Sequence, residues 1–145
     1  MDHMTIEKKN IYIDVDGVLL TIKNTKPAVN SIEFIHYILA NFNCYWLTTH
    51  CKGDSTPALK YLNQFFDNVI IEKLKTVKTT NWSTLKTEAI DLNSDFFWIE
   101  DYPFQAEINI LEYNNKKDNL IIVDLNQPNE LLRIIELLKK SISTN

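Results

Sequence analysis

The chain has few of the residues that mark several common protein classes. Of its 145 residues only 2 are glycine and 4 are proline, which excludes a collagen-like or low-complexity chain. Cysteine occurs only at Cys44 and Cys51, which form neither a CxxC pair nor a disulfide framework. Low cysteine usage of this kind is typical of a reducing compartment, so the sequence predicts a cytoplasmic protein.

Long apolar runs and excess basic charge are also lacking. No apolar run approaches the roughly 20 residues of a membrane-spanning helix, and residues 1–10 lack the apolar core of a signal peptide. We therefore expect no membrane partner. The formal net charge is −4 and Arg133 is the single arginine, so nucleic acid is not a favoured partner. The sequence leaves the oligomeric state open.

What the chain does contain indicates one folded domain. Its composition is 45% hydrophobic and 11% aromatic, enough for a sizeable core, and its length suits a single domain. Residues 1–9 are predicted to be an N-terminal extension, in which His3 and Met4 resemble a cloning scar. Residues 10–145 are predicted to form the domain.

Strand-like and helix-like segments alternate along this domain. Short apolar runs predict buried strands at residues 11–13, 44–48, 69–71, 96–99 and 120–123. Apolar residues at helical spacing predict helices at residues 30–42, 56–66, 83–92, 104–111 and 128–140. Asn30, with Glu33 three residues later, is expected to form a capping box. The alternation indicates an α/β fold with a five-stranded parallel sheet and helices on both faces.

Polar residues follow these strands at their carboxyl ends. The candidate site residues are Asp14 and Asp16 after the first strand, Thr48 and Thr49 after the second, Glu100 and Asp101 after the fourth, and Lys86 near the start of the preceding helix. Parallel strands bring their carboxyl ends to one edge of the sheet, where open α/β folds bind ligands. These side chains are therefore expected to converge.

Their chemistry indicates phosphoryl transfer. Clustered carboxylates repel one another unless a cation neutralises them, and oxygen ligands favour Mg²⁺. A carboxylate beside the ion can attack phosphorus, and a second one nearby can act as acid and base. A hydroxyl group and an ammonium group would hold the phosphate oxygens.

The same residues carry a resemblance to a known family. Residues 12–19 resemble the first motif, DxDGxL, of the haloacid dehalogenase-like (HAD) phosphohydrolases. Thr48, Lys86 and the pair Glu100-Asp101 resemble the second, third and fourth motifs, in the same order along the chain. The resemblance covers residues 11–123. It implies a three-layer Rossmann-like fold with the sheet order 5-4-1-2-3, and it makes the domain a catalytic one.

The resemblance also implies a role for each residue. Asp14 would be the nucleophile that forms an aspartyl-phosphate, and Asp16 would protonate the leaving group and later activate water. Thr48 and Lys86 would bind phosphate, with Thr49 a rival for the role of Thr48. The cofactor implied is Mg²⁺.

In the implied magnesium site, the metal rests on Asp14, on the main-chain carbonyl of Asp16 and on Asp101. Glu100 would be a further ligand or would support the others. The stretches between the motifs are too short for an inserted cap domain. Capless relatives tend to act on large or macromolecular phosphoesters, or use a neighbouring subunit as a lid. The expected partner is therefore a phosphorylated substrate whose identity is left open, either a large one or a small metabolite.

Some assignments have alternatives. Lys75 and Lys78 precede Lys86 and could take its role. His50 could touch the substrate, but it is interpreted as a solvated loop residue. The alternative function is a catalytically silent domain of the same fold that binds a phosphorylated ligand or a protein partner. A receiver-like signalling domain is disfavoured, because no aspartate ends the predicted strand at residues 69–71.

Overall fold

Four short parallel strands form the sheet of the structure, a computed structural model that describes residues 7–143. The strands are β1 (Asn10–Ile13), β2 (Asn43–Trp46), β3 (Phe96–Glu100) and β4 (Leu120–Ile122). Their order is β2-β1-β3-β4, and each neighbouring pair is parallel. The predicted α/β class with a parallel sheet is confirmed, and the arrangement is compatible with a Rossmann-like fold. The sheet has four strands, however, and the prediction of five was wrong.

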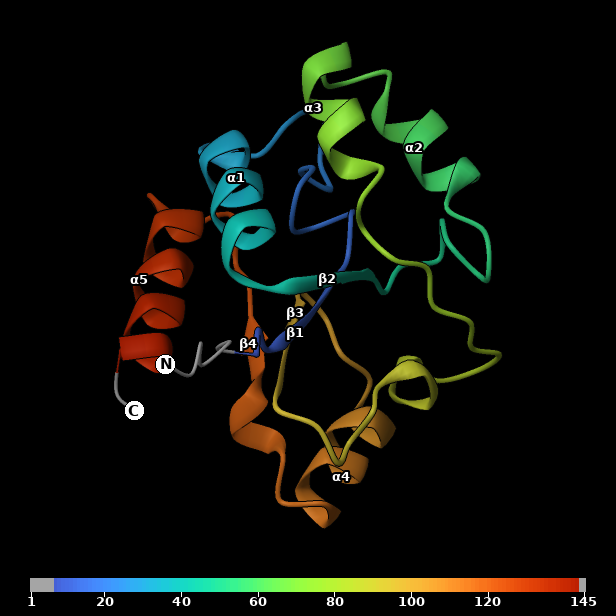
Figure 1. Cartoon of the computed structure of the whole chain (residues 1–145), viewed down its shortest axis with the longest axis vertical. Helices are drawn as coiled ribbons and strands as arrows, with labels where there is room; N and C mark the ends of the chain where they lie inside the picture. The colour runs from blue at the N-terminus through green and yellow to red at the C-terminus, as the bar shows by residue number, and fades with distance from the viewer. Residues whose placement is uncertain (1–6, 144–145) are drawn as a thin grey trace, which may run out of the picture.

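Helices cover both faces of this sheet. They are α1 (Ser31–Asn41), α2 (Thr56–Leu62), α3 (Asn68–Leu74), α4 (Gln105–Tyr113) and α5 (Glu130–Ser143), joined by the 3₁₀ turns η1 (Lys86–Ala89) and η2 (Lys117–Asn119). Figure 1 shows α1 and α4 on opposite sides of the strands. Within residues 7–143, none of the helices combines the length and the apolar character needed to cross a bilayer.

The two central strands, β1 and β3, are largely buried on both faces, which explains their apolar sequences. In β1, Ile11 and Ile13 belong to the larger apolar cluster, which also contains the buried residues of α1, α3 and α5. Tyr12 lies in a smaller cluster with Trp98 of β3 and Leu111 of α4. Successive side chains of a strand point to opposite faces, so the central strands need apolar residues at every position.

The predicted third strand at residues 69–71 is wrong, because this segment lies in helix α3. The Asp67 side chain caps α3 by accepting the main-chain N–H of Ile70 at 3.0 Å. Ile70 and Leu74, one helical turn apart, are both buried in the larger cluster. Short β-branched runs favour strands by propensity, but the cap and the helical spacing prevail here.

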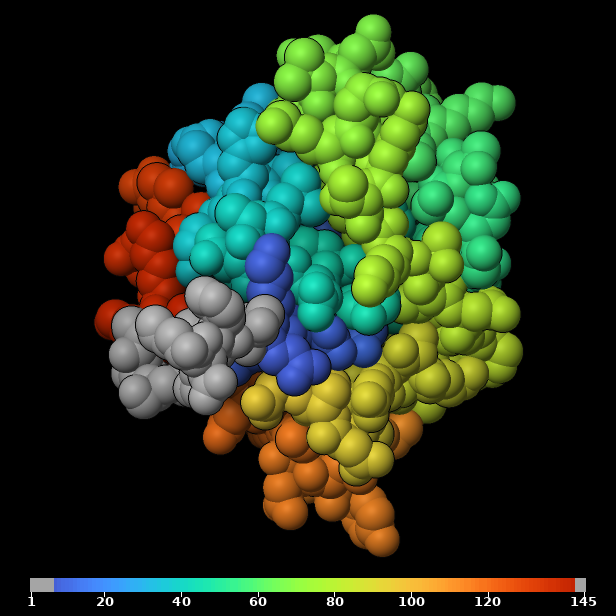
Figure 2. Space-filling model, in the orientation of Figure 1, coloured from blue at the N-terminus to red at the C-terminus, as the bar shows by residue number. Residues whose placement is uncertain are grey.

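An extended segment around Lys78 occupies the position beside β2 that the missing strand was expected to fill. The main-chain N–H of Lys78 donates to the carbonyl of Cys44 at 2.9 Å, and that of Trp46 donates to the carbonyl of Lys78 at 2.9 Å. The pairing is an isolated parallel bridge. Figure 2 shows the yellow-green segment after α3 at the surface, beside the green segment around α2. No aspartate occurs from Lys78 to Asn81, so a receiver-like site at this edge remains disfavoured.

Two smaller expectations also need correction. Asn30 adopts a left-handed conformation with φ of 66° and makes no side-chain cap, although its amide donates to the Glu33 carboxylate. The helix predicted at residues 83–92 is reduced to η1. The first three residues of the predicted helix form a loop instead. The Glu88 carboxylate holds this loop by accepting the main-chain N–H groups of Ser83, Thr84 and Leu85.

Candidate functional site

The carboxyl ends of β1 and β3 lie side by side. Ile13 of β1 is in register with Ile99 of β3, and the main-chain N–H of Asp14 donates to the carbonyl of Ile99 at 3.3 Å. Ile13 is also in register with Trp46 of β2 on the other side. The residues that follow these strands therefore meet at one edge of the sheet.

Three carboxylates form a cluster at this edge, which we call the acidic cluster. One oxygen from each of Asp14, Glu100 and Asp101 lies within 4.8 Å of the other two, and Asp14 and Glu100 are buried. Like charges at this separation repel, and a cation relieves the repulsion. Oxygen ligands are those that Mg²⁺ prefers, and one or two carboxylates are enough for it. The donor set therefore fits Mg²⁺.

Gly17 makes the close approach of Asp101 possible. Its φ is +84°, a left-handed conformation that favours glycine, and a Cβ atom there would lie 2.2 Å from the Asp101 Cγ. Any other residue at position 17 would displace the Asp101 carboxylate. The glycine at position 17 thus leaves room for the Asp101 carboxylate beside Asp14 and Glu100.

Lys86 joins two members of the acidic cluster. Its Nζ donates to Asp14 Oδ2 at 2.9 Å and to Glu100 Oε1 at 2.7 Å. Of the two rival lysines, Lys75 pairs with a neighbour on its own helix, and Lys78 lies over an aromatic ring of β2. Within residues 7–143, Lys86 is thus the one of the three lysines seen at the cluster.

The electrostatics of the cluster arise from this buried group of charges. Burial lowers the pKa of Lys86, but attraction to Asp14 and Glu100 outweighs burial and leaves that pKa raised. Burial raises the pKa of the Glu100 carboxyl, and repulsion from Asp14 raises it further, while Lys86 opposes both. The positive charge of Lys86 therefore stabilises negative charge on the two carboxylates, which burial and their mutual repulsion disfavour.

A carboxylate outside the acidic cluster, that of Glu107, binds the main chain of Lys86. Glu107, only 2% exposed, accepts the main-chain N–H of Lys86 at 2.7 Å through Oε2. Its Oε1 accepts the main-chain N–H of Phe104 at 2.8 Å, in the capping box of α4. The start of α4 and the start of η1 are thereby linked. The sequence alone does not identify Glu107 as a site residue, because it shows only an acidic residue near the start of a helix.

The two threonines after β2 differ in exposure. Thr48 is fully buried, and its Oγ1 accepts the main-chain N–H of His50 at 3.3 Å. Its carbonyl accepts the N–H of Cys51 at 3.1 Å, which closes a turn. Thr49 is exposed on that turn. Thr48 is therefore the threonine fixed at the strand end.

The Asp16 carboxylate does not belong to the acidic cluster and is held by two other residues. Its Oδ2 lies 2.8 Å from His50 Nε2, and its Oδ1 accepts the Tyr61 hydroxyl at 3.1 Å. The two rings stack, with centroids 4.2 Å apart and planes at 17°. His50 is thus a partly exposed loop residue, and it is also paired with Asp16. Tyr61 had not been singled out, because a tyrosine in an apolar helical stripe gives no sign of its partner.

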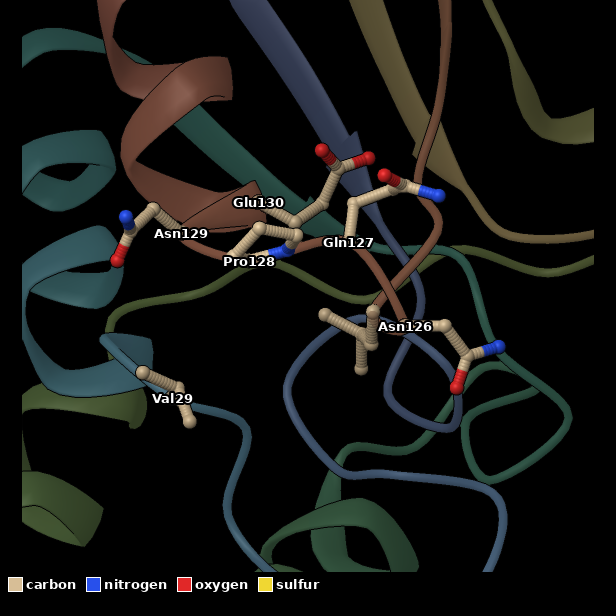
Figure 3. Close-up of a pocket in the computed structure, with 7 residues that line it drawn as sticks. Val29, Asn126, Gln127, Pro128, Asn129 and Glu130 are labelled. Carbon is tan, nitrogen blue, oxygen red and sulfur yellow. The ribbon is translucent and has the colours of Figure 1, made fainter.

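Of two cavities, only one is lined by a residue of the acidic cluster. One of about 670 Å³ is lined by Gly17 and Asp101, together with the loop after β1 and the loop after β4. Another of about 350 Å³ lies between Val29 and the β4–α5 loop (Figure 3). None of the predicted site residues lines the second cavity, so the first is the one that opens beside the acidic cluster.

Comparisons with models of protein families, with curated proteins and with solved structures give no match to this chain.

Proposed function

We propose that this chain is a Mg²⁺-dependent phosphomonoester hydrolase of the HAD type, acting through an aspartyl-phosphate at Asp14. The observation that carries the proposal is the contact of Asp14 with Lys86 at 2.9 Å, inside a cluster that also contains Glu100 and Asp101. A nucleophilic carboxylate, a cation for the phosphate and further carboxylates for a metal are the groups such a reaction needs.

In the first step, an Asp14 oxygen attacks phosphorus and the bond from phosphorus to the leaving oxygen breaks. The leaving oxygen takes a proton from Asp16, so the organic product departs as a neutral alcohol. An ammonium group has three N–H donors. Lys86 uses two on Asp14 and Glu100, so its third can bind a phosphate oxygen.

In the second step, water attacks the phosphorus of the aspartyl-phosphate and Asp16 takes the proton from that water. The bond between phosphorus and the Asp14 oxygen then breaks, which releases phosphate and restores the carboxylate. Asp14, Asp101 and the main-chain carbonyl of Asp16 would hold Mg²⁺, with Glu100 beside them. When bound, the metal would offset the negative charge of the carboxylates and of the phosphate.

The test is hydrolysis of para-nitrophenyl phosphate, measured with Mg²⁺ and with EDTA. We expect turnover that requires the metal and that falls by at least about a thousandfold in Asp14→Asn, because the amide is not a nucleophile. Asp118→Asn, an exposed aspartate in η2, is the matched control and should retain full activity.

Retained turnover in Asp14→Asn would remove the nucleophile assignment. Wild-type protein that binds phosphate and Mg²⁺ but hydrolyses no member of a phosphoester panel would instead favour the silent binding domain. Circular dichroism of each variant checks that the fold is intact.

A further inference from the structure

The side chains of His50 and Tyr61 both contact the Asp16 carboxylate, outside the acidic cluster. The two residues occupy both oxygens of the Asp16 carboxylate, His50 at 2.8 Å and Tyr61 at 3.1 Å. They come from the β2–α2 loop and from α2, whereas Asp16 lies in the loop after β1. Three segments that are distant in sequence therefore meet at one carboxylate.

Ring contacts hold the His50 and Tyr61 side chains together. The ring of Tyr61 stacks on His50 on one side and meets Phe65 edge-on, with centroids 5.6 Å apart. Stacked and edge-on ring pairs each add a modest attraction beyond the area they bury. The ring contacts thus help to place the tyrosine hydroxyl and the histidine nitrogen beside Asp16.

Stability alone does not account for this arrangement. The Asp16 side chain is 36% exposed and that of His50 is 26% exposed. Partly exposed contacts of this kind contribute little to folding stability. Two contacts on one carboxylate, however, fix the direction in which its oxygens point. The consequence of the arrangement is therefore the orientation of Asp16.

We propose that His50 and Tyr61 are positioning residues that aim Asp16 at the leaving oxygen of the substrate. The inference rests on the proposed function, in which the Asp16 proton passes to that oxygen as its bond to phosphorus breaks. A carboxylate has about four lone-pair sites on its two oxygens. Two contacts therefore leave sites on both oxygens for the proton that is transferred.

The dependence on leaving group separates this role from a structural one. Protonation matters most for a poor leaving group such as phenol and least for para-nitrophenol. We expect Tyr61→Phe and His50→Gln to lower kcat about tenfold or more on phenyl phosphate, a fraction of the usual general-acid contribution of about 10²–10⁴. On para-nitrophenyl phosphate the loss should be at most about threefold, and KM should not change on either substrate.

Tyr37→Phe and His36→Gln, both on α1, are the matched controls and should leave both substrates unaffected. In an Asp16→Asn background, adding Tyr61→Phe should not lower kcat further, because the amide has no acidic proton to transfer to the leaving oxygen. Thermal melting of every variant identifies any that fails to fold. Tyr61→Phe keeps the ring and both ring contacts, so it is the variant expected to fold normally.

An equal loss of kcat on both substrates, or a loss expressed only in KM, would overturn the positioning role while leaving the phosphohydrolase intact. So would additive effects of Tyr61→Phe and Asp16→Asn. Absence of turnover by the wild-type protein on every aryl phosphate would instead overturn the proposed function, and the positioning role with it.

Discussion

Lys86 contacts two buried carboxyl groups that lie close together, and its single positive charge can offset one negative charge between them. Its side chain is only 13% exposed, and those of Asp14 and Glu100 are 11% and 4% exposed. Charges this far from water interact strongly, and removal of one partner leaves the others uncompensated. The lysine is therefore expected to matter for stability as well as for phosphate binding.

Replacement of Lys86 by methionine tests this expectation, since methionine keeps most of the apolar stem. We expect Lys86→Met to lower the free energy of unfolding in urea by about 3 kcal/mol at neutral pH. Mg²⁺ should recover more stability in this variant than in the wild type, because the cation replaces the lost positive charge. Lys75→Met, at an exposed ion pair, is the control. Equal stability of the two variants would show that the acidic cluster does not need the lysine.

The two cysteines are expected to be unreactive in the folded protein. Cys44 and Cys51 are both buried free thiols. Burial raises the pKa of Cys44 to about 12, so the thiolate that reacts with disulfide reagents is scarce at mildly alkaline pH. Ellman's reagent should detect no thiol until urea unfolds the chain, and then both. Rapid labelling of the native protein would contradict the burial of these residues.

Glu88 of the η1 turn binds the main chain of the loop just before that turn. Glu88 accepts three main-chain N–H groups and the Ser83 hydroxyl, and these contacts, mainly those with the main chain, lower its pKa to about 2. A lowered pKa in the folded state means that this stabilisation is present above about pH 4.5 and is lost as the pH falls toward about 2.

Glu88→Gln should therefore have a lower Tm than the wild type at neutral pH, with the difference shrinking as the pH falls below about 4.5. Thermal unfolding across this pH range, with Glu112→Gln as the control at an exposed ion pair, measures the effect. A difference in Tm that stays constant at all pH values would show that the ionised carboxylate does not hold the turn.

At the level of secondary structure, the sequence predicted most elements and failed where a short apolar run was ambiguous. The run at residues 69–71 looks the same for a strand and for a buried helical turn. Val69 is 63% exposed, so the triplet is not uniformly buried as a parallel strand would require. The Asp67 cap was the available signal for a helix, and its position just before the run could have been used.

At the level of the whole molecule, the parallel topology accounts for how much of the site could be predicted. Parallel strands bring their carboxyl ends to one edge, and because β1 and β3 are neighbours, Asp14 lies near Glu100 and Asp101. The partners of Asp16 could not be predicted in this way. Tyr61 depends on where α2 packs, and that placement follows from side-chain contacts that no local pattern encodes.

The proposed reaction requires a covalent bond between Asp14 and phosphorus, and direct detection of that bond is its sharpest test. Asp16→Asn should slow breakdown of the intermediate, while para-nitrophenyl phosphate needs little protonation to leave, so the phosphorylated protein should accumulate. After an acid quench, peptide mass spectrometry should find one phosphoryl group on Asp14, removable by hydroxylamine and absent from the double variant with Asp14→Asn. A phosphoryl group on His50, or metal-dependent turnover with no labelled aspartate, would contradict the account.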